Sequence, residues 1–197
     1  MRLLLIFFLI FFSSTNQSKQ LVIGHRGAKG HVAENTLASI KKAMELGAHG
    51  IEIDVFRCLT GEIVLFHDKK LDFLTNGKGL IENKSLSELK KLKVLGSSEG
   101  IPTLKEVFEI IDNNTFLNIE LKGSNTARLS LDIVKEQLSK NKVSHHNILF
   151  SSFNWKELQD LRDLDSKIKI ALVTSNDPLK AIDSALKLSA VAINPDY

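Results

Sequence analysis

Cysteines, long apolar segments and excess charge of one sign are all scarce in this sequence. Cys58 is the only cysteine, so no intrachain disulfide can form, and we expect it to be a small packed side chain on a strand. The formal net charge is only +3, and the lysines are dispersed without a basic stripe interleaved with aromatic residues. This pattern argues against a nucleic-acid-binding protein.

The one long apolar run is "LLLIFFLIFF" at residues 3–12, well short of the ~20 residues that span a bilayer. It follows the positive start Met1-Arg2 and precedes the small, polar stretch at 13–20, which is the order typical of a secretory signal peptide. We therefore expect residues 1–18 to be a signal peptide, or alternatively an N-terminal anchor. The protein is then secreted or periplasmic, or in the alternative membrane-anchored.

Strand-like and helix-like segments alternate through the rest of the chain, from residue 19 to residue 197. The strand candidates are residues 21–25, 50–56, 62–68, 116–122, 147–153, 167–173 and 190–195. The helix candidates are residues 36–46, 85–93, 103–111, 127–139, 154–164 and 178–188. Repeated strand–helix units favour one α/β domain with a parallel sheet, namely a TIM (β/α)8-type barrel of about seven units, incomplete at its C-terminus. A doubly wound open sheet is the alternative.

Acidic residues interrupt two of the predicted strands. Side chains alternate along a strand, so Glu52 and Asp54 share one face of the first, while Asn118, Glu120 and Lys122 share one face of the second. A parallel strand buried on both faces is normally a continuous apolar run. Converging carboxylates need a positive charge to offset their burial, and oxygen ligands suit Ca²⁺ or Mg²⁺. An internal salt-bridge network without a metal is the alternative.

Two histidines, His25 and His67, stand at the ends of different predicted strands, and Arg26 follows the first. Two imidazoles at one mouth, beside acids and an arginine, can divide the roles of general base and general acid near neutral pH. The remaining histidines have no such neighbours, and we expect surface or loop positions for them: His31, His49, His145 and His146.

Taken together, these pieces resemble the glycerophosphodiester phosphodiesterase family. The ordered motifs are "GHRG" (24–27), "ENT" (34–36), "GAHGIEIDV" (47–55), "EIVLFHD" (62–68), "IPTLKEV" (101–107), "LNIELK" (117–122) and "SSF" (151–153). The resemblance extends from residue 21 to about residue 195 and implies a TIM barrel with its site at the C-terminal face.

The resemblance also implies roles for individual residues. The implied metal ligands are Glu52, Asp54 and Glu120, the catalytic residues are His25 and His67, and the substrate-binding residues are Arg26, Lys122, Glu34 and Phe153. Asn35 resembles a supporting residue of the first loop, and helix capping is an equally good interpretation of it. The implied reaction is hydrolysis of a glycerophosphodiester to an alcohol and glycerol 3-phosphate, assisted by a divalent cation, with water or a substrate hydroxyl as nucleophile.

Two departures from the family pattern keep other functions open. Phe73 and Leu74 stand where the family has an arginine and a threonine, and the chain ends at Tyr197 before a Trp-Thr strand. The alternatives are a phospholipase D-like enzyme acting on lysophospholipids, with an apolar rim at its mouth, and an inactive, incomplete barrel. The rim candidates are Phe56, Phe66, Phe73 and Phe153. Membrane contact is then expected through a lipid-derived substrate or the leader.

Overall fold

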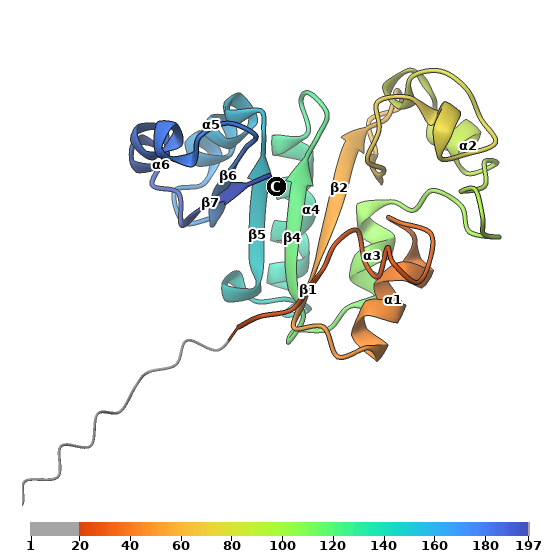
Figure 1. Ribbon diagram of the computed structural model, residues 1–197, viewed down its shortest axis with the longest axis horizontal. Helices are drawn as coiled ribbons and strands as arrows, with labels where there is room; N and C mark the ends of the chain where they lie inside the picture. Colours follow the sequence, from red (N-terminus) through yellow and green to blue (C-terminus); the bar gives the residue numbers. More distant parts are fainter. Residues whose placement is uncertain (1–19, 197) are drawn as a thin grey trace, which may run out of the picture.

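The computed structural model describes residues 20–196, and these form one seven-stranded sheet with helices packed along it (Figure 1). The predicted leader, residues 1–18, lies outside the described residues. The strands are β1 (Ile23–Gly24), β2 (Gly50–Arg57), β3 (Ile63–Leu65), β4 (Phe116–Leu121), β5 (Ile148–Ser152), β6 (Ile170–Thr174) and β7 (Ala192–Pro195). Within residues 20–196, no helix has the length and apolar character that crossing a membrane requires.

The helices occupy the predicted segments, with some shorter than expected. They are α1 (Leu37–Glu45), α2 (Leu86–Leu89), α3 (Leu104–Ile110), α4 (Ala127–Ser139), α5 (Trp155–Leu164) and α6 (Ile182–Lys187). The predicted capping boxes are present at α2 and α3, where Ser85 and Thr103 each accept a hydrogen bond from the backbone three residues on. The helix expected at residues 85–93 ends early, since α2 is a single turn.

Six parallel strands follow one another across the sheet in chain order, β1-β2-β4-β5-β6-β7. A doubly wound sheet would reverse direction part-way, so the order excludes that alternative. Ile53, Ile119, Phe150 and Leu172 on β2, β4, β5 and β6 belong to one buried core cluster, which the helices complete. The fold is therefore a curled, barrel-type α/β sheet that is open between β7 and β1, as the sequence predicted for an incomplete barrel.

Strand β3 departs from the predicted parallel pattern. It pairs antiparallel with the carboxyl-terminal part of β2, with Val55 opposite Leu65, and lies off the path of the parallel strands. The segment at 62–68 is therefore a hairpin partner and not a barrel strand. Because β3 runs back along β2, its end returns toward Asp54, whose carbonyl accepts a hydrogen bond from the Phe66 N–H at 3.0 Å.

A second, smaller hydrophobic cluster supports the segment between β3 and α3. It joins Phe56, Cys58, Val64 and Phe66 of the β2–β3 hairpin to four residues of that segment and to the chain leading into α3. The four are Leu71, Ile81, Leu89 and Val94. Cys58 is buried and free, as expected, with its Sγ 3.2 Å from a Glu62 carboxylate oxygen. It does not lie on a strand as predicted, because β2 ends one residue earlier, at Arg57.

Candidate active site

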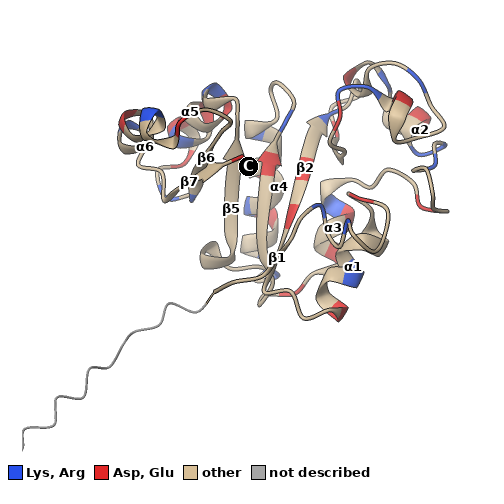
Figure 2. Ribbon diagram, in the orientation of Figure 1, with Lys and Arg blue, Asp and Glu red and all other residues tan. Residues whose placement is uncertain are grey.

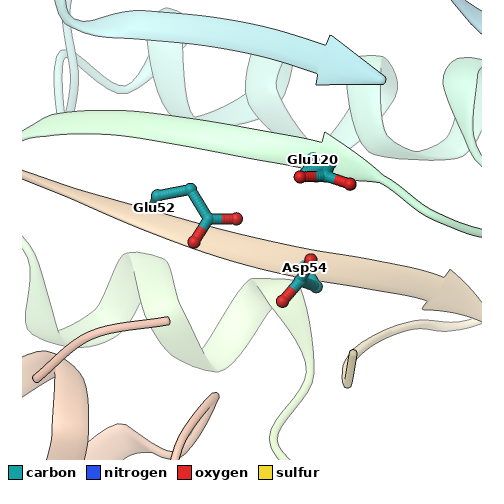
Figure 3. A group of neighbouring side chains, drawn as sticks. All are labelled: Glu52, Asp54 and Glu120. Atoms are coloured by element: carbon teal, nitrogen blue, oxygen red, sulfur yellow. The ribbon is translucent and has the colours of Figure 1, made fainter. Parts of the chain in front are cut away.

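Three carboxylates from two neighbouring strands point toward one another at the open face of the sheet (Figure 3). Glu52 and Asp54 lie on β2, and Glu120 lies on β4 directly opposite Asp54 in the strand register. Each offers an oxygen, and these oxygens all lie within 4.8 Å of one another. Figure 2 shows acidic residues, in red, on both β2 and β4. The alternation predicted from the sequence does bring these residues together.

Burial makes this cluster electrostatically unfavourable on its own. Burial and the carboxylates of Asp54 and Glu120 raise the pKa of Glu52 to about 8, although the Arg26 backbone N–H opposes the shift. Burial also raises the pKa of Asp54, against a hydrogen bond from Asn35. Among the described residues, the buried Oε1 of Glu52 accepts no hydrogen bond, and the Oε1 of Glu120 has only the Lys122 ammonium beside it, at 3.1 Å. Three carboxylates with oxygen donors at this spacing fit a divalent cation such as Ca²⁺ or Mg²⁺.

Asn35 holds Asp54 in place from the loop before α1. Its Nδ2 donates to Asp54 Oδ2 at 2.9 Å, and its Oδ1 accepts from the Asp54 backbone N–H at 3.1 Å. The helix-capping interpretation of Asn35 is wrong, because Thr36 is the N-cap of α1 and forms a capping box with Ser39. Asn35 has a φ of 54°, a left-handed conformation that asparagine tolerates better than most residues.

Arg26 also packs against the acidic cluster. Its backbone N–H donates to Glu52 Oε2 at 2.9 Å, its Nε lies 3.3 Å from Asp54 Oδ2, and its Nη1 donates to Glu34 Oε1 at 2.8 Å. The turn is tight: a Cβ on the following Gly27 would lie 2.3 Å from Ser39 Oγ, and Gly27 has a φ of +79°. The "GHRG" motif therefore folds the Arg26 backbone onto Glu52.

Glu34 lies beside Arg26 and Lys29 and does not line the central cavity. Burial alone raises the pKa of Glu34, but hydrogen bonds from Arg26 and Lys29 outweigh it and hold that pKa below its usual value. The contact of Glu34 with substrate stays a prediction. The ion pair shows that Glu34 orients the Arg26 guanidinium.

Lys122, His67 and Asp68 form a chain of polar contacts at the other side of the cluster. Lys122 Nζ lies 3.1 Å from Glu120 Oε1, 3.9 Å from Asp54 Oδ1 and 3.3 Å from His67 Nε2. The other ring nitrogen, His67 Nδ1, lies 2.7 Å from Asp68 Oδ1. This arrangement fits a tautomer in which Nδ1–H donates to Asp68 and leaves the Nε2 lone pair facing the cavity.

His25 flanks the cluster opposite His67, with its Nε2 3.8 Å from Glu52 Oε2. Burial, together with the nearby charges of Arg26 and Lys29, lowers the pKa of His25, which favours the neutral imidazole near pH 7. The other histidines lie apart from the cavity: His31, His145 and His146 are exposed, and His49 accepts a hydrogen bond from the Val22 backbone.

The three carboxylates, the two cationic side chains and the two histidines line one cavity of about 540 Å³ at the carboxyl ends of the strands: Glu52, Asp54, Glu120, Arg26, Lys122, His25 and His67. It also contains Asn118 and Ser151, on β4 and β5, which were not among the predicted site residues. Both are buried, and Asn118 Oδ1 and Ser151 Oγ have no hydrogen-bond partner among the described residues. Strand alternation is the signal that identifies them, since Asn118 lies opposite Glu52 and Ser151 opposite Glu120.

Phe153 lies at the rim of the cavity, 43% exposed, with its ring centroid 5.5 Å from Lys122 Nζ. Phe73 is also exposed, whereas Phe56 and Phe66 are buried in the second hydrophobic cluster. Of the four phenylalanines proposed for an apolar rim, Phe153 alone lines the cavity; Phe73 is exposed on the segment between β3 and α3, and core packing accounts for the other two.

The fold and the cavity together define a TIM-barrel-type α/β protein with a polar cavity at the carboxyl ends of its strands, the place where enzymes of this fold have their active sites. The sequence profile of the "Glycerophosphoryl diester phosphodiesterase family" matches residues 25–196. This chain belongs to that family of phosphoric diester hydrolases.

Individual relatives agree with this assignment. The chain is 38% identical over 186 residues to a glycerophosphodiester phosphodiesterase of Caldanaerobacter subterraneus subsp. tengcongensis, covering 91% of this chain and 76% of that protein. It is 36% identical over 160 residues to a putative glycerophosphodiester phosphodiesterase of Bacillus subtilis, covering 78% and 65%.

A solved structure of an Oleispira antarctica phosphodiesterase, in complex with the product sn-glycerol-3-phosphate, superimposes with a TM-score of 0.81 at 33% identity. The match covers 89% of this chain and 74% of that one. The matches thus cover between 65% and 76% of the length of these three relatives.

Proposed function

We propose that this protein hydrolyses glycerophosphodiesters to an alcohol and glycerol 3-phosphate, with a divalent cation and two histidines. The observation that carries the proposal is the buried cluster of Glu52, Asp54 and Glu120, flanked in one cavity by His25 and His67. The product named for the Oleispira antarctica structure supports the same substrate class.

The charge balance of the cavity suits an anionic ester. Glu52, Asp54 and Glu120 would hold the cation, which when bound polarises a phosphoryl oxygen and makes the attacking hydroxyl more acidic. Lys122 supplies a compact positive charge beside Glu120, and Arg26 offers guanidinium donors that Glu34 orients. The two cationic side chains would bind the phosphate and stabilise the negative charge that builds up during displacement.

Proton transfer falls to the two imidazoles. One of them accepts the proton of the nucleophile, and the other donates a proton to the departing alcohol. The lowered pKa of His25 favours its neutral form, and Asp68 fixes the His67 ring with Nε2 directed at the cavity. Each of the two imidazoles, His25 and His67, can therefore accept or donate a proton at the cavity wall. The nucleophile is water, or a hydroxyl of the substrate's own glycerol that gives a cyclic intermediate.

The direct test is incubation of the purified chain with glycerophosphocholine and Ca²⁺ or Mg²⁺. We expect release of choline and glycerol 3-phosphate that EDTA abolishes and added cation restores. His25→Asn and His67→Asn should each remove most of the activity, whereas His31→Asn, an exposed histidine outside the cavity, should not. Cation binding without release under any divalent ion would contradict the proposal and favour the inactive-barrel alternative.

The second candidate function is phospholipase D-like cleavage of lysophospholipids. The observation in its favour is the exposed ring of Phe153 at the rim, where an acyl chain would find apolar surface. Parallel assays with glycerophosphocholine and lysophosphatidylcholine distinguish the two substrates. Phe153→Ser should lower turnover of the lysolipid far more than turnover of the soluble diester if the rim binds an acyl chain.

A further inference from the structure

The net positive charge of this protein is carried by the segment between β3 and α3, because basic and acidic residues are equal in number over the rest of the chain. Residues 69–100 contain seven lysines and four acidic residues, an excess of three positive charges, which equals the formal charge of the entire chain. Figure 2 shows the lysines along the loops of this segment. Exposed Lys69, Lys70, Lys78 and Lys91 form no ion pair within residues 20–196.

Large apolar side chains are exposed among these lysines. Phe73 is 76% exposed, Leu95 is 53% exposed and Leu80 is 41% exposed. Backbone pairing brings the parts of the chain that carry these side chains near one another. Lys70 and Leu80 form an isolated antiparallel β-bridge, and the Leu95 N–H donates to the carbonyl of Leu74, next to Phe73, at 2.9 Å. We call this surface the basic tip and define it as Lys70, Phe73, Lys78, Leu80, Lys93 and Leu95.

The basic tip is held by well-packed residues beneath it. Leu71, Ile81, Leu89 and Val94 are buried in the second hydrophobic cluster, although they belong to the same segment as the exposed residues. The short strand-like contact of Thr75 with Val94 fixes the two halves of the segment. The exposed side chains therefore project from a folded support.

This surface lies on the same side of the molecule as the active-site cavity. His67 and Asp68 lead directly into the segment, which extends beyond the carboxyl end of β2 in Figure 1. Its Glu82 Oε1 accepts a hydrogen bond from the Ser124 N–H, just after β4, at 3.3 Å. The segment that carries the basic tip therefore begins at His67, a residue of the cavity wall, and also contacts the chain that follows β4.

We propose that the basic tip docks on the surface of an anionic phospholipid membrane. Exposed aromatic and aliphatic side chains enter the boundary between headgroups and acyl chains, and neighbouring lysines bind anionic headgroups, so the combination suits this partner. A protein partner could bind the exposed apolar side chains without unpaired lysines around them, whereas an anionic membrane uses both. The proposal extends the proposed function, because a phospholipid headgroup contains the same glycerophosphodiester that the cavity is proposed to bind.

A probe attached at one position tests the proposal locally. Cys58 is buried, so Leu95→Cys gives a single accessible thiol for a polarity-sensitive fluorophore. Leu186→Cys on α6 is the matched control: Leu186 is 73% exposed, but residues 177–187 around it contain two lysines and two aspartates. Each labelled full-length chain is mixed with vesicles of phosphatidylcholine alone or with about one third phosphatidylglycerol.

We expect the probe at residue 95 to report an apolar environment on anionic vesicles, and 0.5 M salt to reverse the change. The probe at residue 186 should stay in water. Phe73→Ser in the Leu95→Cys chain should weaken vesicle binding about tenfold, the usual effect of losing one inserted aromatic side chain.

Equal responses of the two probes, or no response of the probe at residue 95, would overturn the proposal. If the probe at residue 95 does not respond to the anionic vesicles either, the basic tip is not a membrane-binding surface, and a protein partner becomes the alternative. Hydrolysis of soluble glycerophosphocholine by the unlabelled chain is measured in parallel. It reports on the proposed function alone, because that substrate needs no membrane.

Discussion

Asn35 and Asp54 are joined by two hydrogen bonds, from Asn35 Nδ2 to Asp54 Oδ2 and from the Asp54 N–H to Asn35 Oδ1. One amide thus fixes both the side chain and the backbone of a proposed cation ligand. Both residues are buried, so removal of the amide would take away both hydrogen bonds that it makes with Asp54. Groups of this kind, which orient a ligand from behind, have large effects on metal affinity.

Asn35→Gly should therefore weaken cation binding by about 10-fold to 100-fold, measured by calorimetry with Ca²⁺. Glycine adopts the φ of 54° at this position freely, so the backbone remains unstrained. Asn141→Gly is the matched control, because Asn141 has a φ of 55° and its exposed side chain makes no hydrogen bond within the described residues. Equal Ca²⁺ affinity in the two variants would contradict a role for Asn35 in orienting Asp54.

Lys122→Met should lower kcat for glycerophosphocholine on the order of 10²-fold, the usual cost of losing a group that stabilises developing charge. Methionine keeps much of the side-chain length but removes the charge between Glu120 and His67. Lys156→Met, at a lysine of α5 that pairs with Asp160 on the surface, should leave kcat unchanged. A Lys122→Met chain with normal kcat and a raised KM would indicate a role in substrate binding alone.

The stability of the cation-free chain should fall as the pH rises from about 4.5 to about 8. The pKa of Glu52 rises from 4.5 to about 8 on folding, so between these values the folded state holds a proton that the unfolded state has released. The raised pKa of Asp54 acts in the same direction. The lowered pKa of Glu34 has the opposite sign and acts below pH 4.5. The lowered pKa of His25 also has the opposite sign and acts below about pH 6.5, so the decline should be steepest between about pH 6.5 and pH 8.

The measurement is the midpoint of thermal unfolding in EDTA between pH 5 and pH 8.5. Glu52→Gln should flatten the decline, and saturating Ca²⁺ should raise the midpoint most at the alkaline end, because the ionised carboxylates then have their counter-charge. An EDTA-treated chain whose midpoint is level across this range would show that the carboxylates are not electrostatically strained.

Glu157→Gln should destabilise the fold by about 2–4 kcal/mol, because the buried Glu157 carboxylate satisfies the first turn of α4. It accepts hydrogen bonds from the backbone N–H groups of Asn125, Thr126 and Ala127 and from the Thr126 hydroxyl. The amide replaces one acceptor oxygen with a donor that faces these donors.

Urea unfolding checks this prediction. Glu136→Gln is the control, since Glu136 is a surface residue of α4 paired with Lys140, and exposed ion pairs contribute little to stability, so its loss should cost much less than that of Glu157. Similar losses in both variants would mean that the buried cap contributes no more than a surface ion pair.

The sequence by itself determined that Glu52 and Asp54 share one face of a strand, and that Glu120 and Lys122 share one face of another. This follows from the two-residue period of a strand, a local property that requires no knowledge of the rest of the fold. Helix positions and capping boxes are local in the same sense, and the boxes at Ser85 and Thr103 are confirmed.

Only the tertiary structure decided how His67 reaches the carboxylates. A parallel strand and an antiparallel hairpin strand have the same apolar alternation, so the pattern at 62–68 did not distinguish them. The hairpin with β2 brings the chain back to Asp54, and Lys122 then meets the His67 ring from β4. The clamp of Asn35 on Asp54 and the contact of Ser151 with the cavity depend likewise on strand register and loop geometry, which pairing between distant segments sets.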